Sequence, residues 1–274
     1  MTGAKNFLLT AITRDPCVVR AADAAGVDRI GIDIERLGKA DRQGSIPGAR
    51  ISDHSLDDLP AVAAHVTRAE LFIRVNPIHD GSRAEIDRAI ALGAGAVMLP
   101  YFTTADEAAS FVGMIDGRAS PVLLVETASA AAGIDEIVRV GGVAEIMVGL
   151  NDLHMSLGLP SHFDVVVSDL METIAAAVRG GGMRFGFGGL ARVDDAALPV
   201  PPDLVCAQYP RLGATSAWLS RSFFRGLARP FEIDAAVRTL RARLSFWADQ
   251  PPSALAETRD RLTAVLGGLH RAER

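Results

Sequence analysis

The sequence predicts one (β/α)₈ barrel with additional helices after it. Short, almost continuous apolar runs alternate with amphipathic or alanine-rich segments, as expected of strands that helices cover on both faces. The length of 274 residues suits such a barrel, which commonly takes roughly 250 residues. A doubly wound open sheet is the alternative, but no glycine-rich dinucleotide-binding turn follows the first apolar run.

Eight of the apolar runs are predicted strands, at residues 6–12, 29–35, 70–76, 96–100, 121–127, 145–150, 184–188 and 216–221. The segments between them carry helix signals. The first, residues 15–26, opens with Asp-Pro and closes on glycine, the pattern of a capped helix with a first-turn proline. Residues 201–215 are ambiguous, and the Leu-Gly pair before the last run favours a helix there.

Two further helices are predicted after Pro230, at about 231–248 and 252–270, more than a closed barrel needs. We therefore divide the chain into a catalytic barrel, residues 1–228, and a helical extension, residues 229–274. The extension carries apolar residues beyond what one barrel requires: Phe231, Ile233, Val237, Leu240, Leu244 and Trp247.

The composition limits the classes of function. A chain that is 49% hydrophobic and 22% charged can bury a large core, and its net charge of −5 argues against nucleic-acid binding. Two cysteines, Cys17 and Cys206, indicate a reducing compartment and are assigned to core packing. The first apolar run is too short to span a membrane. We expect a cytoplasmic protein with no membrane partner.

Polar side chains gather at the predicted C-terminal ends of the strands, where barrel enzymes place their active sites. The acidic members are Asp33, Glu35, Glu126 and Asp152, and Arg74, Asn76 and Asn151 lie beside them. Glu126 and Asp152 end neighbouring strands and can hold one Mg²⁺ or Mn²⁺ ion between them, or can simply cap the next helices. Arg74 can clamp a substrate carboxylate or can pair with Glu70 or Glu126.

A long polar loop, residues 36–55, follows the second strand and carries Arg36, Lys39, Arg42 and Arg50. It is either a solvated loop or a binding loop in which Arg36 and Arg42 hold an anionic group of a second substrate. His79 and His154 follow strand ends and are candidates for acid–base roles, whereas His54 is interpreted as a surface residue.

Four motifs occur in order along the chain: IGIDIE (30–35), IRVNP (73–77), AGAVMLPYF (94–102) and LLVETASAAAGIDEIVRVGGVAEIMVGLNDLHMSLG (123–158). Together they resemble the HpcH/HpaI aldolase and citrate-lyase β-subunit family. The resemblance runs from residue 6 to about residue 222.

The resemblance implies that Glu126 and Asp152 bind Mg²⁺ or Mn²⁺ and that Arg74 holds a pyruvate-like carboxylate. It also implies that backbone amides of Gly149, Leu150 and Asn151 contact this carboxylate. Asp33, Glu35 and Arg36 complete the candidate catalytic set. The aldolase branch has a histidine base just after the acidic pair of strand two, and this chain has Arg36 there.

The expected activity is therefore divalent-metal-dependent carbon–carbon bond cleavage or formation through the enolate of a 2-oxo acid. A Claisen-type lyase of acyl-CoA thioesters and a barrel that binds a carboxylated metabolite without catalysis are the alternatives. In the family the C-terminal helices pack onto a neighbouring subunit, which implies a homo-oligomer, a trimer or hexamer. An extra helical layer on the same barrel is the other interpretation.

Overall fold

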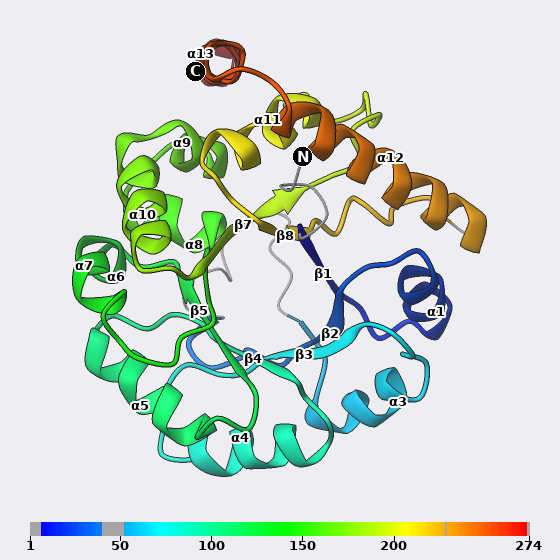
Figure 1. Ribbon diagram of the computed structural model, residues 1–274, viewed down its shortest axis with the longest axis vertical. Helices are drawn as coiled ribbons and strands as arrows, with labels where there is room; N and C mark the ends of the chain where they lie inside the picture. The colour runs from blue at the N-terminus through cyan, green and yellow to red at the C-terminus, as the bar shows by residue number, and fades with distance from the viewer. Residues whose placement is uncertain (1–6, 40–51, 228, 273–274) are drawn as a thin grey trace.

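The computed structural model describes residues 7–39, 52–227 and 229–272. Within this part of the chain, eight parallel strands close into a barrel in sequence order, so the predicted fold class is confirmed (Figure 1). The strands are β1 (Leu8–Ile12), β2 (Arg29–Asp33), β3 (Glu70–Arg74), β4 (Ala96–Leu99), β5 (Ser120–Val125), β6 (Glu145–Val148), β7 (Arg184–Leu190) and β8 (Ser216–Leu219).

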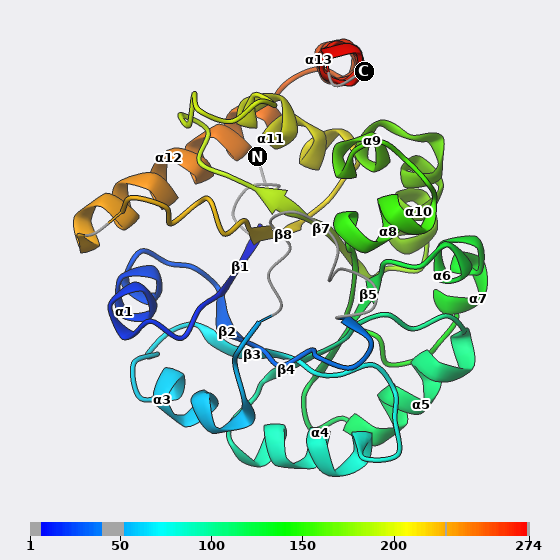
Figure 2. The same cartoon turned by 180° about the vertical axis from the view of Figure 1, so that it is seen from behind.

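Helices surround the barrel, and Figure 2 shows the same ring from behind. In the described residues they are α1 (Pro16–Ala24), α3 (Leu59–Ala63), α4 (Ser82–Ala91), α5 (Ala105–Ile115), α6 (Ala128–Ala132), α7 (Ile134–Ile137), α8 (Leu150–Ser156), α9 (His162–Val167), α10 (Asp169–Gly180), α11 (Pro202–Arg211), α12 (Pro230–Ala248) and α13 (Pro252–Ala272), with a 3₁₀ turn, η2 (Leu56–Asp58). None of these helices is long and apolar enough to cross a membrane.

Helices that the sequence predicts from capping patterns are present in the structure. The Asp15 carboxylate accepts the backbone N–H groups of Cys17 and Val18, and Pro16 occupies the first turn of α1. The ambiguous segment 201–215 forms the helix α11. Each predicted strand is present, but most end one or two residues early. The ladder stops where the chain turns outward, so Glu35, Asn76 and Glu126 lie just beyond their strands.

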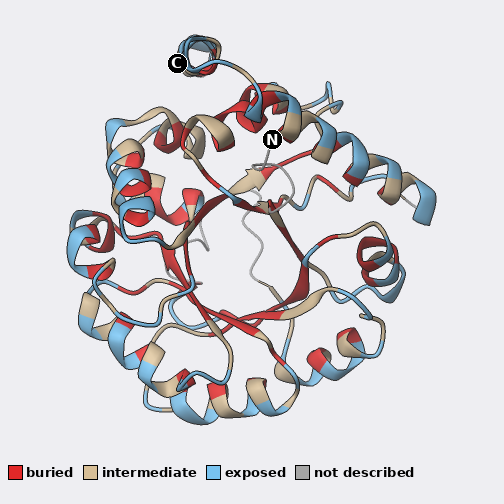
Figure 3. Cartoon of the chain, in the orientation of Figure 1, coloured by how far each residue is buried: buried red, intermediate tan, exposed pale blue. Residues whose placement is uncertain are grey.

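Buried residues gather on the strands and on parts of the surrounding helices (Figure 3). Alternation along the strands divides the apolar side chains into two layers. One layer lies between the outer face of the barrel and the helices. A smaller layer fills the barrel interior and consists of Phe72, Ala96, Met98, Val122, Leu124 and Met147, with Ile12 and Trp218 packed against it. This inner layer forms a floor beneath the strand ends, so the barrel is packed below and can hold a site only at its mouth.

The lower end of the barrel carries a buried charge cluster of its own. Nε of Arg29 donates to Glu70 at 2.6 Å, and Nη1 of the same guanidinium pairs with Glu145. Arg184 lies opposite Glu145 in the register of β6 and β7. These four residues, which we call the base cluster, are the first residues of β2, β3, β6 and β7, so they lie at the end opposite the mouth.

The C-terminal helices pack on their own barrel. α12 lies against α1 and α11, and α13 lies against α11 and α9 (Figure 1). Arg241 on α12 donates to the carbonyl oxygens of Phe7 and Gly26 at 3.0 and 2.6 Å. Of the six apolar residues singled out in this extension, five are buried and Phe231 is 60% exposed. Association into a homo-oligomer stays a prediction.

The two cysteines differ. Cys206 on α11 is buried, and burial raises the pKa of its thiol to about 12. Cys17 is exposed, so its assignment to core packing is wrong. Cys17 lies in the first turn of α1, and the buried residues of that helix begin only at Val19.

Candidate active site

Arg74 is anchored at the barrel mouth by Asp33. The two residues lie opposite each other in the register of β2 and β3. Nε and Nη2 of Arg74 donate to the two oxygens of Asp33 at 2.8 and 2.6 Å, and Nη2 lies 3.3 Å from Glu35. The expected partners Glu70 and Glu126 are not the ones used, since Glu70 starts β3 at the opposite end of the barrel. Nη1 of the guanidinium takes part in none of these bonds, so its N–H donors are not used by Asp33 or Glu35.

The electrostatics of this pair keep both groups charged. Burial alone would raise the pKa of the Asp33 carboxyl, but its contacts with Arg74 outweigh burial and lower it to about 2. Burial opposes the charge of Arg74, and the neighbouring carboxylates of Asp33 and Glu35 outweigh it, so the pKa of Arg74 is raised. The pair is therefore a fixed ionic anchor across the working pH range.

Lys39 belongs to the site, although the sequence alone places it in the polar loop 36–55 and assigns it no role there. Its side chain is buried, and Nζ lies 2.6 Å from Oε2 of Glu35 and 3.6 Å from Oδ2 of Asp33. Glycine at position 38 has φ +68°, a backbone conformation that side chains disfavour, and it turns the chain back into the mouth. The one sequence signal was the spacing of four residues between Glu35 and Lys39.

Asn76 builds the turn that brings Lys39 inward. Its Oδ1 accepts the backbone N–H groups of Arg36 and Leu37 at 2.9 and 3.1 Å. Glu85 on α4 in turn fixes Asn76 by accepting from both its backbone N–H and its Nδ2. The asparagine of IRVNP therefore acts on the loop after β2.

Arg36 does not join the buried carboxylates. Its side chain is exposed, and Nη2 donates to the carbonyl oxygen of His54 at 3.0 Å. Arg42 and Arg50 lie outside the described residues. His54 is half-buried, and its Nδ1 accepts the backbone N–H of Asp33 at 3.2 Å, so its interpretation as a surface residue is wrong.

Glu126 and Asp152 lie at neighbouring strand ends, as predicted, and both are buried. Oε1 of Glu126 accepts the backbone N–H of Tyr101 at 2.9 Å. Glu126 does not cap the next helix, because Thr127 is the N-cap of α6 and accepts from Ala130. Asp152 lies in the first turn of α8.

Gly149 makes room for the Glu126 side chain. A Cβ atom added at Gly149 would lie 2.7 Å from Cβ of Glu126 and would also collide with its carboxylate. The backbone N–H of Gly149 donates to the carbonyl oxygen of Val125 at 3.0 Å. This donor is therefore already used by the barrel ladder, and the expected contact of Gly149 with a substrate carboxylate stays a prediction. Leu150 is buried and Asn151 is exposed in the first turn of α8.

Among the described residues, the buried charged groups at the mouth include more acids than bases. Asp33, Glu35, Glu126 and Asp152 are four carboxylates, and Arg74 and Lys39 are two cations, so full ionisation leaves a formal excess of two negative charges. We call these six residues the mouth cluster. Burial, followed by repulsion from Glu35 and Asp152, raises the pKa of the Glu126 carboxyl well above its ordinary value.

A bound divalent cation would remove this excess, and oxygen donors suit Mg²⁺ or Mn²⁺. Glu126 and Asp152 are the pair that fit such an ion, because Arg74 and Lys39 already hold Asp33 and Glu35. The described residues contain no group of three or more His, Cys, Asp or Glu side chains arranged to hold a metal. Two protein ligands would leave the remaining positions of an octahedral ion to water and substrate.

The remaining candidate histidines, His79 and His154, have contacts with residues outside the mouth cluster. Nε2 of His79 is 3.8 Å from Glu85 beside α4. His154 on α8 faces His162, with ring centroids 6.2 Å apart. Burial and the nearby His154 lower the pKa of His162 to about 4. These positions do not place His79 or His154 beside Glu126.

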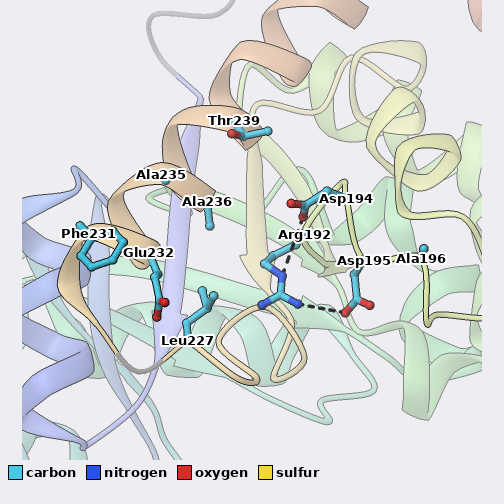
Figure 4. A pocket seen from close by; sticks show the side chains of 10 residues that line it. All are labelled: Arg192, Asp194, Asp195, Ala196, Leu227, Phe231, Glu232, Ala235, Ala236 and Thr239. Atoms are coloured by element: carbon cyan, nitrogen blue, oxygen red, sulfur yellow. Dashed lines mark ion pairs between the residues drawn. The ribbon is translucent and has the colours of Figure 1, made fainter.

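Two surface cavities of about 390 Å³ each lie elsewhere. The first lies between α12 and the segment after β7, where Arg192 pairs with Asp194 and Asp195 (Figure 4). The second lies behind α8 and α9, beneath α13. Neither includes a residue of the mouth cluster, so buried charge rather than cavity size identifies the candidate site.

The chain is similar to several known proteins. The chain is 25% identical over 209 residues to the 4-hydroxy-4-methyl-2-oxoglutarate aldolase cghB of Chaetomium globosum, covering 64% of this chain and 72% of that protein. Its fold is similar to a HpcH/HpaI aldolase/citrate lyase family protein from Burkholderia cenocepacia J2315 (TM-score 0.63, 19% identity, 89% and 95% coverage of this and that chain). It is also similar to CitE from Mycobacterium tuberculosis in complex with magnesium and acetoacetate (TM-score 0.62, 18% identity, 94% and 99% coverage).

The family model of HpcH/HpaI aldolase/citrate lyase matches residues 8–187, which contain β1 to β6, most of β7 and all six residues of the mouth cluster. The chain therefore belongs to the HpcH/HpaI aldolase/citrate lyase family.

Proposed function

We propose that this protein is a divalent-metal-dependent carbon–carbon lyase that acts through the enolate of a pyruvate-like 2-oxo acid. The observation that carries the proposal is that the four buried carboxylates of the mouth cluster gather beside the fixed cation of Arg74. A cation site next to a cationic anchor suits a ligand that has a carboxylate and a metal-chelating oxygen on adjacent carbons.

In this proposal, Glu126 and Asp152 hold the ion. Bound there, Mg²⁺ or Mn²⁺ supplies stabilisation of the negative charge that develops on the 2-oxo oxygen. Tyr101 fixes the Glu126 carboxylate through its backbone N–H, and Gly149 lets that carboxylate lie close to the backbone. The chain thus orients its ligands before the ion arrives.

Arg74 binds the substrate carboxylate through the donors that Asp33 leaves unused. Asp33 holds the guanidinium with two hydrogen bonds and so fixes its orientation. Glu35 and Asp33 together hold the ammonium of Lys39 on the same side of the mouth. Asp33 and Glu35 are positioning residues in this scheme, because they act through Arg74 and Lys39.

The test measures hydrogen–deuterium exchange of the pyruvate methyl group by NMR, with Mg²⁺, Mn²⁺ or Co²⁺ added in turn. We expect metal-dependent exchange in the wild type and none in Glu126→Gln or Asp152→Asn. Glu145→Gln is the matched control, because it removes a buried carboxylate from the base of β6 and leaves the mouth unchanged.

Exchange that persists without added metal after chelation, or in the Glu126→Gln variant, would contradict the proposal. Binding of pyruvate without exchange under any metal would favour a barrel that binds a carboxylated metabolite. Exchange on an acetyl thioester but not on pyruvate would favour the Claisen-type alternative.

A further inference from the structure

The barrel mouth has two unlike halves. The mouth cluster belongs to β2, β3, β5 and β6 and the segments after them. On β1, β7 and β8 the alternation of side chains directs Ile12, Gly188 and Trp218 toward the barrel interior, and none of these side chains carries a charge. The assignment for β7 follows from Phe185 and Phe187, which belong to the outer apolar layer. Among the described residues, a ligand at the mouth therefore meets charge on one side and uncharged strand ends on the other.

Trp218 marks the boundary between the halves. Cζ of Arg74 lies 5.0 Å from the centroid of the indole ring, which is within cation–π range. The ring also meets Phe72 edge to face, with centroids 5.9 Å apart, so it rests on the inner apolar layer. Trp218 and Ile12 are partly exposed, whereas Phe72 and the rest of that layer are buried. The open part of the mouth thus reaches down to the indole.

The indole also has an unused donor. Nε1 of Trp218 is buried and has no hydrogen-bond partner among the described residues. An unpaired buried donor costs free energy, and a native protein rarely keeps one without a ligand or a water to accept it. The donor lies on the residue that already contacts Arg74, so an acceptor on the bound ligand is the partner that the site lacks.

Gly188 leaves open space on β7, the strand that pairs with β8, which carries Trp218. A Cβ atom added at Gly188 would meet no atom within 4 Å, whereas one added at Gly186, two residues earlier on β7, would lie 2.6 Å from the carbonyl oxygen of Ser216. The interior is therefore full at the level of Gly186 and open at the level of Gly188.

We propose that Trp218, Gly188 and Ile12 form the subsite for the aldehyde partner of the reaction, that this subsite takes an uncharged alkyl or aryl aldehyde, and that Nε1–H of Trp218 donates to its oxygen. This inference rests on the proposed function, because the 2-oxo acid must occupy the charged half. It differs from the anionic second substrate that the loop arginines suggested, since the side chain of Arg36 lies outside the mouth cluster.

The first measurement compares kcat/KM for condensation of pyruvate with butanal and with glyoxylate. We expect the wild type to favour butanal. Trp218→Phe keeps an aromatic face and removes the donor, and should lower the butanal value about 3-fold to 10-fold. Gly188→Val fills the open space, and should lower it about 10-fold. Gly113→Val is the matched control, since Gly113 is exposed on α5 with equally open space.

The second measurement follows binding without turnover. The chain has two tryptophans, so Trp247→Phe leaves Trp218 as the single source of indole fluorescence. Trp247 lies on α12, where Nε1 donates to Asp203, away from the mouth. We expect a saturable change in emission with butanal, a smaller change with glyoxylate, and loss of the butanal response when Gly188→Val is added.

The outcomes separate the two proposals. A butanal response without pyruvate exchange would contradict the proposed function, and with it the assignment of the subsite to an aldehyde partner. Pyruvate exchange without a butanal response would overturn the subsite. Tighter binding and faster turnover of glyoxylate than of butanal would also overturn it, and would favour an anionic second substrate. Equal losses in Gly113→Val and Gly188→Val would also overturn it, because the effect would then not depend on the mouth.

Discussion

At the base of the barrel Arg29 lies between Glu70 and Glu145, whereas at the mouth Arg74 and Lys39 lie among four carboxylates. Both clusters are built on the ends of β2, β3 and β6, and both contain buried ion pairs. At the base two acids meet Arg29 and the neighbouring Arg184, so the charges balance within the chain. The four carboxylates and two cations of the mouth cluster, by contrast, leave a formal excess of two negative charges among these six residues.

On this difference we assign the base cluster to structure and propose that the mouth cluster binds a ligand. Burial opposes the charge of Arg29, but Glu145 and Glu70 outweigh burial and raise its pKa, as in a closed pair. At the mouth the imbalance appears as the raised pKa of Glu126, which a cation beside it would reverse. We therefore expect mutations at the base to lower mainly the stability of the protein, and mutations at the mouth to lower mainly its affinity for a metal ion.

The largest expected effect is on stability and comes from the base. Arg29→Met leaves Glu145 buried without its cation, and we expect the free energy of unfolding to fall by about 3–5 kcal/mol. Urea denaturation measures this loss, and Mn²⁺ affinity of the folded variant should not change. Arg88→Met removes an exposed pair with Asp57 and should cost about 0–1 kcal/mol. Equal losses in the two variants would remove the distinction between buried and exposed pairs.

The next effect is on metal affinity and comes from the mouth. Glu126→Gln or Asp152→Asn should weaken Mn²⁺ binding by at least about 100-fold, since each removes one of two protein ligands and one negative charge. Isothermal titration calorimetry measures the affinity. The same measurement on Glu145→Gln should give the wild-type value. If Glu145→Gln weakened binding as much as Glu126→Gln, the two clusters would not be functionally distinct.

Lys39 should have opposite effects on cations and anions. Lys39→Met raises the excess at the mouth from two negative charges to three, so Mn²⁺ should bind at least as tightly as in the wild type. Binding of a 2-oxo acid in the presence of metal should weaken about 10-fold, equal to about 1.4 kcal/mol. Lys39→Arg keeps the charge and should keep both affinities. Parallel weakening of metal and 2-oxo acid in Lys39→Met would instead indicate local unfolding.

The smallest effect concerns His162, which belongs to neither cluster. Its pKa is about 4 in the folded protein and 6.5 in its ordinary state, so the unfolded chain binds the proton more readily between these values. Stability should therefore fall as the pH drops from 6.5 toward 4, by about 1 kcal/mol after allowance for solvent. Urea denaturation at pH 7 and at pH 4.5 measures the free energy of unfolding. Between these two pH values, the wild type should lose about 1 kcal/mol more of it than His162→Gln. A larger loss in the variant would contradict the assignment.

Much of the site follows from the sequence because strand ends are marked by local patterns. An apolar run that stops at a polar residue identifies Asp33, Arg74, Glu126 and Asp152, and parallel strands must bring those ends to one rim. The roles within the rim do not follow. Whether Arg74 pairs with Asp33, Glu70 or Glu126 depends on strand register and on which end of β3 each acid occupies.

Residues that reach the mouth from loops or from distant strands were missed for a related reason. Lys39 enters the site because Gly38 and Asn76 turn its loop inward, and His54 meets Asp33 from the far side of that loop. Trp218 reads as an ordinary apolar residue of the last strand until closure of the barrel places its ring against Arg74.

The sequence by itself determined the eight alternating strands, the helices that cover them, the extra C-terminal helices and the acidic character of one rim. These depend on apolar periodicity, helix caps and chain order, which are local properties. The tertiary structure alone decided that, among the described residues, four carboxylates gather with two cations at the mouth and two acids with two arginines at the base, and that the mouth has a charged and an uncharged half. Charge balance and shape depend on which side chains meet across the barrel, and contacts between residues as far apart as Arg74 and Trp218 exist only once the barrel has closed.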